Sequence, residues 1–314
     1  MPVVQTIHGP ISADALGTTL MHEHVIFDFN PDRRGEAIAF AIKLLQEAGA
    51  LGMRSLVELT PTRQISWLVE IAAAVPEINL ICSTGYYLER LTPEPLRDLG
   101  EDEMAERFVR ELTEGIDDSG VRAGIIKIAA NRPELTDWEK RVFRAAARAH
   151  RQTGAHIATH ACSGARNQLD YLVEHGVDPN KVFFSHVEAE FGWEGRTLQQ
   201  EADYLLAIVR QGGWLLFNNF GFEWDTPWAD LVYLLRYLMD KGYRERLLIS
   251  MDANWTWNKE GRIEFEAERD HPGAERRTYA YMFTDAVPAL RQAGFSEEDI
   301  TAFLVGNPQL YFSL

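Results

Sequence analysis

Short aliphatic runs alternate with amphipathic helical patterns along nearly all of the 314 residues, and this alternation restricts the fold more than any other feature. Eight runs are predicted to be strands because they are almost continuously apolar, as parallel strands buried on both faces are. They are Thr19–Val25, Arg54–Leu59, Asn79–Ser83, Gly124–Ile128, His156–His160, Val182–His186, Trp214–Asn218 and Leu247–Asp252.

Helical patterns follow these strands one by one. The sequence from Thr136 to Glu139 predicts a capping box, in which the threonine hydroxyl and the glutamate carboxylate bond the free amides of a helix start. Glycines such as Gly154 follow several of the patterns, where a left-handed residue is favoured. The predicted helices are Arg34–Ala50, Gln64–Ala74, Glu103–Ile116, Asp137–Thr153, Asn167–His175, Leu198–Gln211, Trp228–Lys241, Glu275–Ala293 and a short final helix, Ser296–Leu304.

Eight strand–helix units predict a protein of the α/β class with a (β/α)8 TIM barrel. A doubly wound open sheet is the alternative. No G-x-G-x-x-G follows a predicted strand, however, and Gly85, Gly164 and Gly221 stand singly. Because no Pro/Gly/Ser linker, charge block or low-complexity segment interrupts the alternation, we expect a single domain over residues 1–314.

Composition excludes several classes of partner. A formal net charge of -16 argues against binding to nucleic acid or to an anionic membrane, since both would be repelled. No run approaches the roughly 18 apolar residues of a transmembrane helix. Residues 1–16 lack a basic region followed by an apolar one, so we expect no signal peptide. With only Cys82 and Cys162 there is no disulfide framework, which suits the reducing cytoplasm.

Potential metal ligands recur at the carboxyl ends of the predicted strands, where the active sites of barrels are built. His22 and His24 are two residues apart and therefore face the same way on a strand, and imidazole is the commonest metal ligand. A lone histidine would equally well bridge backbone carbonyls. The recurrence of further candidates predicts a shared metal site, which would include Lys127, His160, His186 and Asp252. Glu23 should turn away from the two histidines and support them.

Lys127 stands in an otherwise apolar strand, Gly124–Ala129, where a lone ammonium group would be unfavourable. Burial lowers the pKa of a lysine and leaves a neutral, nucleophilic amine. Such an amine can add carbon dioxide to form a carbamate, an anionic ligand able to bridge two cations. An ion pair with Glu58, at the end of the second strand, is the alternative interpretation.

The chain resembles the phosphotriesterase family of the amidohydrolase superfamily, including the phosphotriesterase-like lactonases, over essentially its full length. The resemblance lies in Gly17–His24, Ile126–Ala129, Thr159–His160, Ser185–His186, Met251–Asp252 and Gly306–Pro308. It implies two divalent metal ions. His22, His24 and Asp252 would hold the more buried ion, and His160 and His186 the more exposed one. Carboxylated Lys127 and a hydroxide would bridge the pair.

Two divalent ions about 3.5–4 Å apart lower the pKa of a shared water and polarise the substrate's carbonyl or phosphoryl oxygen. The ligands suit zinc first, and also Mn, Fe or Co. We expect the bridging hydroxide to attack a lactone or related carboxylic ester, with Asp252 accepting the proton. Weak promiscuous phosphotriesterase activity is a further expectation. The alternatives are a phosphoester or amide hydrolase and, from another class, a non-catalytic binding barrel. The resemblance alone suggests a homodimer.

Substrate choice is less clearly marked. Tyr86 or Tyr87 matches a tyrosine that many lactonases place near the metals. Acyl-homoserine lactonases of the family carry an Asp-Arg-Tyr-type segment after the seventh strand. Here the segment is Asn218–Trp224, which argues against those substrates and makes Asn219 a candidate contact.

Tryptophans gather in the last three loops: Trp193, Trp224, Trp228, Trp255 and Trp257. They are either packing residues or the wall and lid of a pocket, and on the second interpretation Trp255 and Trp257 contact substrate. The loop from Ala253 to about Ala274 is long and charged. Its Lys259 and Arg262 would bind an anionic substrate group or simply face solvent.

Overall fold

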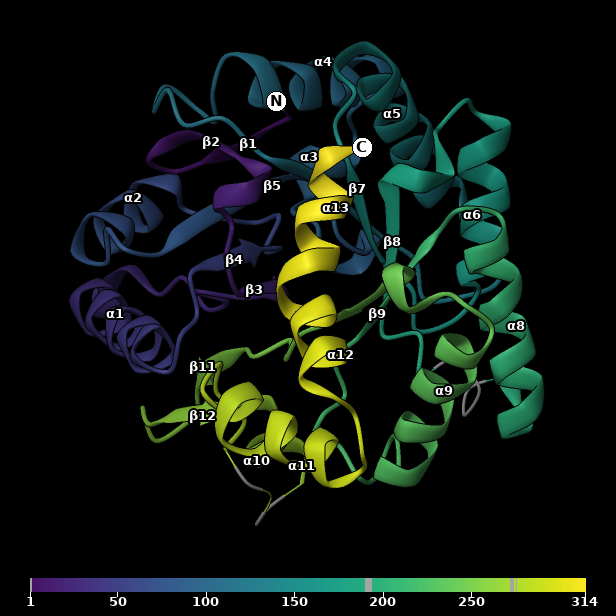
Figure 1. Cartoon of the computed structure of the whole chain (residues 1–314). Coiled ribbons are helices and arrows are strands. Elements are labelled where there is room, and N and C mark those ends of the chain that lie inside the picture. Colours follow the sequence, from purple (N-terminus) through teal and green to yellow (C-terminus); the bar gives the residue numbers. More distant parts are fainter. Residues whose placement is uncertain (1, 190–193, 272–273, 275) are drawn as a thin grey trace.

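Eight parallel strands form one sheet in the computed structural model, which describes residues 2–189, 194–271, 274 and 276–314. The strands follow chain order, so each is paired with its neighbours in sequence, and the predicted (β/α)8 barrel is confirmed (Figure 1). They are β3 (Thr19–Glu23), β4 (Ser55–Glu58), β5 (Asn79–Gly85), β6 (Ile125–Ala129), β7 (Ile157–His160), β8 (Val182–Ser185), β9 (Trp214–Phe217) and β10 (Leu247–Ile249).

The barrel is nearly closed between its first and last strands. The Asp252 amide donates to the His22 carbonyl at 3.1 Å, and the His24 amide donates to the Ala253 carbonyl at 3.3 Å. The buried Glu23 carboxylate accepts hydrogen bonds from the amides of Met251 at 2.7 Å and Ala253 at 2.8 Å. Glu23 therefore points to this seam and joins the two strands, as strand alternation predicted.

Alternate residues of each strand point into the barrel and out toward the helices. Ile125, Ala158 and Phe183 belong to the apolar interior, whereas Ile126 and Phe184 belong to a second apolar cluster that includes residues of the surrounding helices. Because side chains two apart share a face, Lys127 points inward above Ile125, and His160 points inward above Ala158. The strand pattern thus directs these two polar side chains to the end of the barrel interior.

Helices surround the sheet. The predicted capping box at Thr136 and the predicted helix end at Gly154 are both present. The Thr136 hydroxyl accepts from the Glu139 amide at 3.2 Å, and Gly154 ends the same helix at φ 73°. The helices are α1 (Arg34–Ala50), α2 (Ile65–Ala74), α3 (Glu94–Arg97), α4 (Glu101–Thr113), α5 (Asp137–Thr153), α6 (Ala165–Glu174), α8 (Leu198–Arg210), α9 (Trp228–Asp240), α10 (Glu266–Asp270), α11 (Val287–Gln292), α12 (Glu297–Thr301) and α13 (Asn307–Ser313).

The last two predicted helices differ from the structure. In place of Glu275–Ala293 there is a π-helical turn, Met282–Ala286, followed by α11, and Glu275 itself lies outside the described residues. The final helix continues past Leu304 through a second π-helical turn, Ala302–Gly306, into α13. Both wide turns directly precede a segment whose second residue is proline. A proline ring crowds the carbonyl four residues back, and a wider turn relieves that contact.

Two short β-hairpins were not predicted from the sequence. β1 (Val3–Thr6) pairs with β2 (Gly9–Ser12) before the barrel begins, and β11 (Trp255–Trp257) pairs with β12 (Ile263–Phe265) in the loop after β10. Each strand is only three or four residues long, which is too short for a clear period-two pattern.

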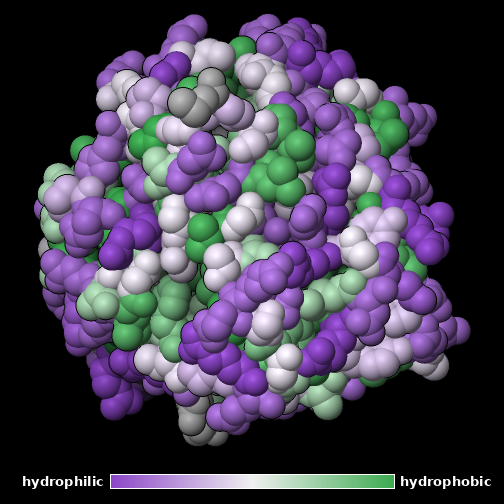
Figure 2. Space-filling model, viewed as in Figure 1, coloured by the Kyte–Doolittle hydropathy of each residue, from purple (hydrophilic) through white to green (hydrophobic). Residues whose placement is uncertain are grey.

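The C-terminal helix α13 closes the amino-terminal end of the barrel. Its Tyr311 is buried and donates to the carbonyls of Ile157 and Lys181, both at 3.0 Å, at the starts of β7 and β8. Among the described residues no helix is long and apolar enough to cross a membrane. The face that carries α13 is mainly hydrophilic, with small separate apolar patches (Figure 2).

Candidate metal centre

His22 and His24 meet Asp252, which follows the last strand, at the open end of the barrel. The Nε2 atoms of His22 and His24 lie 3.4 Å and 3.0 Å from Oδ1 of Asp252. The other ring nitrogen of each, Nδ1, is held by a hydroxyl: His22 by Ser185 at 2.7 Å and His24 by Thr60 at 2.8 Å. Both rings therefore present Nε2 to the same carboxylate. This is the arrangement of metal-binding histidines, whose outer nitrogen is fixed by a second polar group.

Lys127 lies beside these rings, fully buried, with Nζ 3.4 Å from Nε2 of His22. Burial lowers the pKa of Lys127 to about 7, so a neutral amine is readily available. The alternative partner, Glu58, accepts instead from the backbone amides of Thr60, at 2.7 Å, and Val25. The carboxylate of Glu58 thus organises the loop next to His24.

A glycine at the end of β5 sets the position of Lys127. Gly85 has φ 124°, and a Cβ there would lie 1.8 Å from the Lys127 carbonyl oxygen. Only glycine permits this backbone conformation and this close approach of the two strands.

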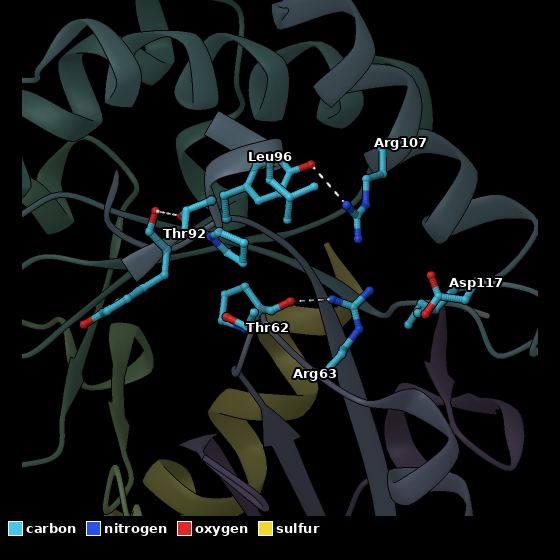
Figure 3. Close-up of a pocket in the computed structure, with 11 residues that line it drawn as sticks. Thr62, Arg63, Thr92, Leu96, Arg107 and Asp117 are labelled. Atoms are coloured by element: carbon cyan, nitrogen blue, oxygen red, sulfur yellow. Dashed lines mark hydrogen bonds between the residues drawn. The ribbon is translucent and has the colours of Figure 1, made fainter. Parts of the chain in front are cut away.

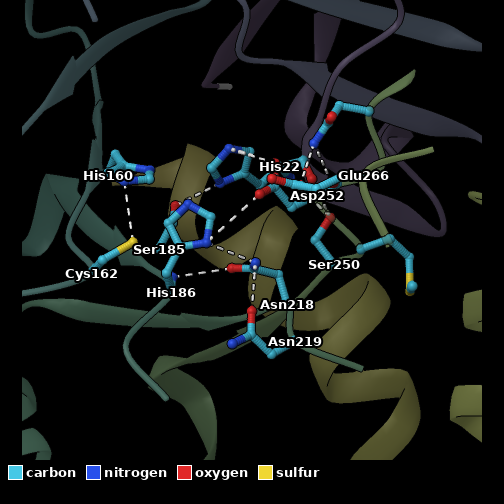
Figure 4. Close-up of polar contacts among 12 residues, drawn as sticks. His22, His160, Cys162, Ser185, His186, Asn218, Asn219, Ser250, Asp252 and Glu266 are labelled. Atoms are coloured by element: carbon cyan, nitrogen blue, oxygen red, sulfur yellow. Dashed lines mark hydrogen bonds and ion pairs between the residues drawn. The ribbon is translucent and has the colours of Figure 1, made fainter. Parts of the chain in front are cut away.

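His160 and His186 extend the cluster to the other side, with ring centroids 4.4 Å apart. The hydroxyl of Tyr87 lies 3.3 Å from Nδ1 of His160. Asn218 accepts from the His186 amide at 3.1 Å, and its Nδ2 lies 2.8 Å from Nδ1 of His186. Figure 4 shows His160, His186 and Asn218 converging with Asp252 from the ends of several strands.

Two residues of the cluster have strained backbones. His186 has φ 64° and Asp252 φ 50°, in the left-handed region that side chains with a Cβ seldom adopt. Residues held in such conformations concentrate at functional sites, because the surrounding structure must enforce them. Each follows the last residues of its strand, so the unusual turn aims its side chain across the barrel mouth.

The electrostatics leave most of the imidazoles neutral. Burial lowers the pKa of His22 and His160 well below the ordinary value, and that of His186 to about 4. Burial opposes ionisation of Asp252 too, but the adjacent imidazoles, His22 first, hold its pKa below the ordinary range. Burial alone would lower the pKa of His24, but its hydrogen bond to Asp252 and the charge of that carboxylate raise it. Neutral imidazoles and an ionised carboxylate are the forms that bind cations.

The donor set fits a transition-metal ion. Among the described residues, His22, His186 and Asp252 form one group close enough to share a cation, and His160, Cys162 and His186 form another. Nε2 of His186 is buried and has no hydrogen-bond partner within the described chain. A buried polar atom without a partner is unfavourable, and a bound cation would satisfy it.

This cluster forms the floor of a cavity of about 490 Å³. Tyr87 and Thr60 line it near the histidines. Farther out its wall combines apolar side chains with a few charged ones, as small-molecule sites commonly do. These outer residues are Phe27, Phe29, Leu59, Leu91, Arg63, Gln64, Glu266 and Arg269.

Only some of the residues predicted to contact substrate line this cavity. Tyr87 lines the cavity. Tyr86 lines a separate, smaller cavity of about 190 Å³, in which Arg63 and Arg107 also lie (Figure 3), and its ring packs against Phe108 and Trp138. Strand ends alternate in direction, so only one of two consecutive tyrosines can face the histidines.

Asn219, Trp255 and Trp257 are not among the described residues that line the main cavity. Asn219 donates to Asp225 at 2.6 Å and so orders its own loop. Trp255 is fully buried against Phe40 of α1, and the guanidinium of Arg33 lies 3.6 Å from the ring centroid of Trp257.

The remaining tryptophans and the basic side chains of the loop after β10 were also considered as substrate contacts. Trp224 is largely exposed and stacks on His271, Trp228 begins α9, and Trp193 lies outside the described residues. Lys259 and Arg262 are exposed. From the same loop, Glu266 and Arg269 line the cavity.

The sequence analysis assigned no role to the residues that contact the histidines. Thr60, Cys162 and Ser185 stand within two residues of strand ends, so a survey of every polar residue at those positions would have found them. Glu266 and Arg269 carry no comparable signal because they belong to a long loop.

Barrel enzymes build their active sites at the carboxyl end of the parallel (β/α)8 barrel, from the loops after the strands. The cluster lies at that end, so the fold and the site are those of this class. Residues 2–312 match the model of the phosphotriesterase family, and the chain belongs to that family. The predicted resemblance is therefore confirmed.

Named relatives align over nearly the whole chain. A phosphotriesterase homology protein of Mycobacterium tuberculosis is 32% identical, over 99% of this chain and 98% of its own. An aryldialkylphosphatase of Saccharolobus solfataricus is 29% identical, over 96% and 97%. A phospho-furanose lactonase of Mycoplasmopsis synoviae is 28% identical, over 97% and 90%.

Solved structures of related proteins also superpose over nearly the whole chain. The phosphotriesterase from Mycobacterium tuberculosis superposes with a TM-score of 0.84 at 30% identity, covering 99% of this chain and 98% of that one. A structure from the engineering of organophosphate hydrolysis on a weak promiscuous lactonase template gives a TM-score of 0.86 at 31% identity, covering 99% of both chains. The protein is a hydrolase acting on ester bonds.

Proposed function

We propose that this hydrolase uses two divalent cations to cleave a lactone or a related carboxylic ester. The observation that carries the proposal is the convergence of four histidines, the Asp252 carboxylate and the Lys127 amine on the floor of one cavity. His22, His24 and Asp252 would hold one cation, and His160 and His186 the other.

Lys127 would supply the remaining ligand. Its buried amine would add to carbon dioxide and release a proton, and the resulting carbamate would offer two anionic oxygens to the cations. The lowered pKa of Lys127, about 7, favours the neutral amine that this addition requires. Its place within 3.4 Å of Nε2 of His22 keeps the product in the cluster.

Bound cations of this kind supply a nucleophilic hydroxide at neutral pH and polarise the oxygen of the ester carbonyl. Asp252, ionised and central in the cluster, is placed to accept the proton released as water attacks. Tyr87 would donate a hydrogen bond to the substrate from the edge of the site. Burial raises the pKa of its hydroxyl well above the ordinary value, so Tyr87 remains a donor.

The cavity wall supports a substrate with an apolar part. Phe27, Phe29 and Leu91 line its outer region, which suits a lactone ring or its alkyl substituent. The names of the relatives support two ester classes, since one is a lactonase and another an aryldialkylphosphatase. We therefore propose the lactone as the main substrate and phosphotriesters as weak ones.

The test is a substrate panel on metal-free protein reconstituted with Zn²⁺, Mn²⁺ or Co²⁺. The panel contains γ- and δ-lactones, sugar lactones, acyl-homoserine lactones and paraoxon. We expect at least one lactone class to be cleaved faster than paraoxon, and only with metal present. If every lactone is inert while a phosphoester turns over, the lactonase assignment is wrong.

Lys127→Ala tests the ligand assignment in the same assay, with the exposed Lys43→Ala on α1 as the matched control. We expect Lys127→Ala to lose bound metal and most activity, and Lys43→Ala to keep both. Retention of two metals and full activity by Lys127→Ala would remove the carbamate from the proposal.

A further inference from the structure

We propose that Cys162 is an additional ligand of the cation held by His160 and His186, which it binds as a thiolate. The inference rests on the proposed metal dependence and adds a sulfur donor to it. The cation at this position would then be held by three protein side chains besides any contribution from Lys127.

The geometry groups the three donors around one space. Sγ of Cys162 lies 3.2 Å from Nε2 of His160. One ligand atom from each of Cys162, His160 and His186 lies within 4.8 Å of the other two. Figure 4 shows the Cys162 side chain extending toward the His160 and His186 rings, with a dashed line from the sulfur to His160.

The local backbone explains why the thiol reaches this place. The Ala161 amide donates to the Ser185 carbonyl at 3.2 Å, so pairing with β8 continues one residue beyond the end of β7. In extended backbone, side chains two apart share a face. Ala161 consequently packs into the apolar layer outside the barrel, while Cys162 returns to the face of His160.

An independent feature of His186 points to a ligand here. The residue is only 6% exposed, and its Nε2 has no hydrogen-bond partner among the described residues. A buried ring nitrogen without a partner is destabilising, as is the left-handed φ of 64° at the same residue. A cation shared with His160 and Cys162 would satisfy that nitrogen.

A simple hydrogen bond from the thiol to His160 is the competing explanation. Burial raises the pKa of the Cys162 thiol well above the ordinary value, so the sulfur keeps its proton when no cation is bound. A coordinating cation reverses this, because a metal-bound thiol is deprotonated outright. The S–H bond breaks, a sulfur–metal bond forms, and the proton leaves to solvent. Only the cation-loaded protein therefore separates the two explanations.

A thiolate ligand would alter the choice of metal. Soft sulfur donors favour Zn²⁺ and Co²⁺, whereas Mn²⁺ prefers oxygen ligands. We therefore expect Cys162→Ser to reduce the preference for Zn²⁺ over Mn²⁺ by about tenfold or more, as changes in metal surroundings commonly do. Direct competition between the two ions measures this preference without any assay of activity.

Co²⁺ gives the most direct test, since thiolate coordination produces a sulfur-to-cobalt charge-transfer absorption in the near ultraviolet. The chain has only two cysteines, so Cys82→Ala isolates Cys162 without altering it. We expect the band in the wild type and in Cys82→Ala, and its loss in Cys162→Ser that still binds Co²⁺.

The outcomes distinguish this inference from the proposed function. Two equivalents of bound Co²⁺ without a charge-transfer band would overturn the role of Cys162 and leave the proposed function intact. A band that persists in Cys162→Ser, or is lost in Cys82→Ala, would also overturn it. Failure of the wild type to bind Co²⁺ would contradict both proposals.

Discussion

Hydroxyl groups fix the two histidines that stand closest to Asp252. Ser185 holds Nδ1 of His22 and Thr60 holds Nδ1 of His24, so both rings turn Nε2 toward the centre. Such outer contacts orient a ligand before the metal arrives, and their loss typically lowers metal affinity by about 10- to 100-fold.

Removal of either hydroxyl should therefore weaken cation binding. We expect Ser185→Ala and Thr60→Ala each to lower Zn²⁺ affinity at least about tenfold, measured by competition with a chromophoric chelator. Thr113→Ala, which removes an exposed hydroxyl on α4, is the control and should change nothing. Wild-type affinity in both site variants would show that the hydroxyls do not orient the rings.

Sequence spacing was sufficient to find the imidazoles and Lys127, because each ends a recognisable strand. Their supporting residues depend on pairing between distant strands: Ser185 reaches His22 across 163 positions. No local pattern specifies such a contact. The choice between Tyr86 and Tyr87 stayed open for a related reason, since the strand end alone does not show which of the two faces inward.

His156 provides a pH prediction away from the metal centre. It lies at the amino-terminal end of the barrel, with its ring centroid 4.6 Å from that of Tyr311. Burial lowers its pKa from 6.5 to about 3. As the pH falls from 6.5 toward 3, the unfolded chain binds a proton at His156 and the folded chain does not. The free energy of unfolding therefore decreases over this pH range.

His156→Phe keeps a ring of similar size and removes the titration. Between pH 6.5 and about 4.5 the metal-free wild type should lose about 2 kcal/mol more unfolding free energy than the variant. Urea unfolding at the two pH values measures the difference. Equal losses in both proteins would mean that His156 is not buried as a neutral ring.

At the scale of elements, the β11–β12 hairpin fixes the position of the loop after β10. Trp255 packs against Phe40 of α1 at a centroid distance of 5.1 Å and against Trp257 at 5.7 Å. The hairpin is thus anchored to the barrel's outer helix. From that anchored position the following α10 carries Glu266 and Arg269 to the cavity. The tryptophans serve packing, and the charged residues beyond them reach the site.

Trp255→Ala should consequently destabilise the protein by about 3–5 kcal/mol, as truncation of a buried aromatic does. Trp224→Ala is the comparison, because Trp224 is 41% exposed and should change stability by about 0.5 kcal/mol or less. Thermal and urea unfolding measure both. A small effect for Trp255→Ala would contradict the anchoring role of the hairpin.

The eight barrel strands were predictable because each is a continuous apolar run flanked by a helical pattern. The strands of the β11–β12 hairpin are three residues long, and Trp255-Thr256-Trp257 alone cannot be distinguished from a loop. The π-helical turns before Pro288 and Pro308 were likewise missed, since the predicted helix Glu275–Ala293 ran through Pro288 without a break and the predicted helix Ser296–Leu304 ended before Pro308.

For the whole molecule, the cluster joins the first and last strands of the barrel. His22 belongs to β3, His24 directly follows it, and Asp252 follows β10, beside the seam that Glu23 closes. A cation held between these strands would also stabilise the closed barrel. Ligand binding to the folded state alone stabilises it by about 2.7 kcal/mol at a hundredfold excess over Kd.

Zn²⁺ should therefore raise the Tm of the metal-free protein, and a chelator should reverse the increase. The variant Asp252→Asn, which removes the carboxylate proposed as a ligand beside the seam, should show a much smaller increase. Differential scanning calorimetry measures both. An unchanged Tm in the wild type across saturating Zn²⁺ would argue against a cation bound at the seam.

The most direct test of the account is the titration of metal-free protein with Zn²⁺ or Co²⁺ while lactone hydrolysis and bound metal are measured together. The account predicts that activity is absent without metal and saturates as two equivalents bind. Full activity without metal, or two bound equivalents without any ester hydrolysis, would contradict it.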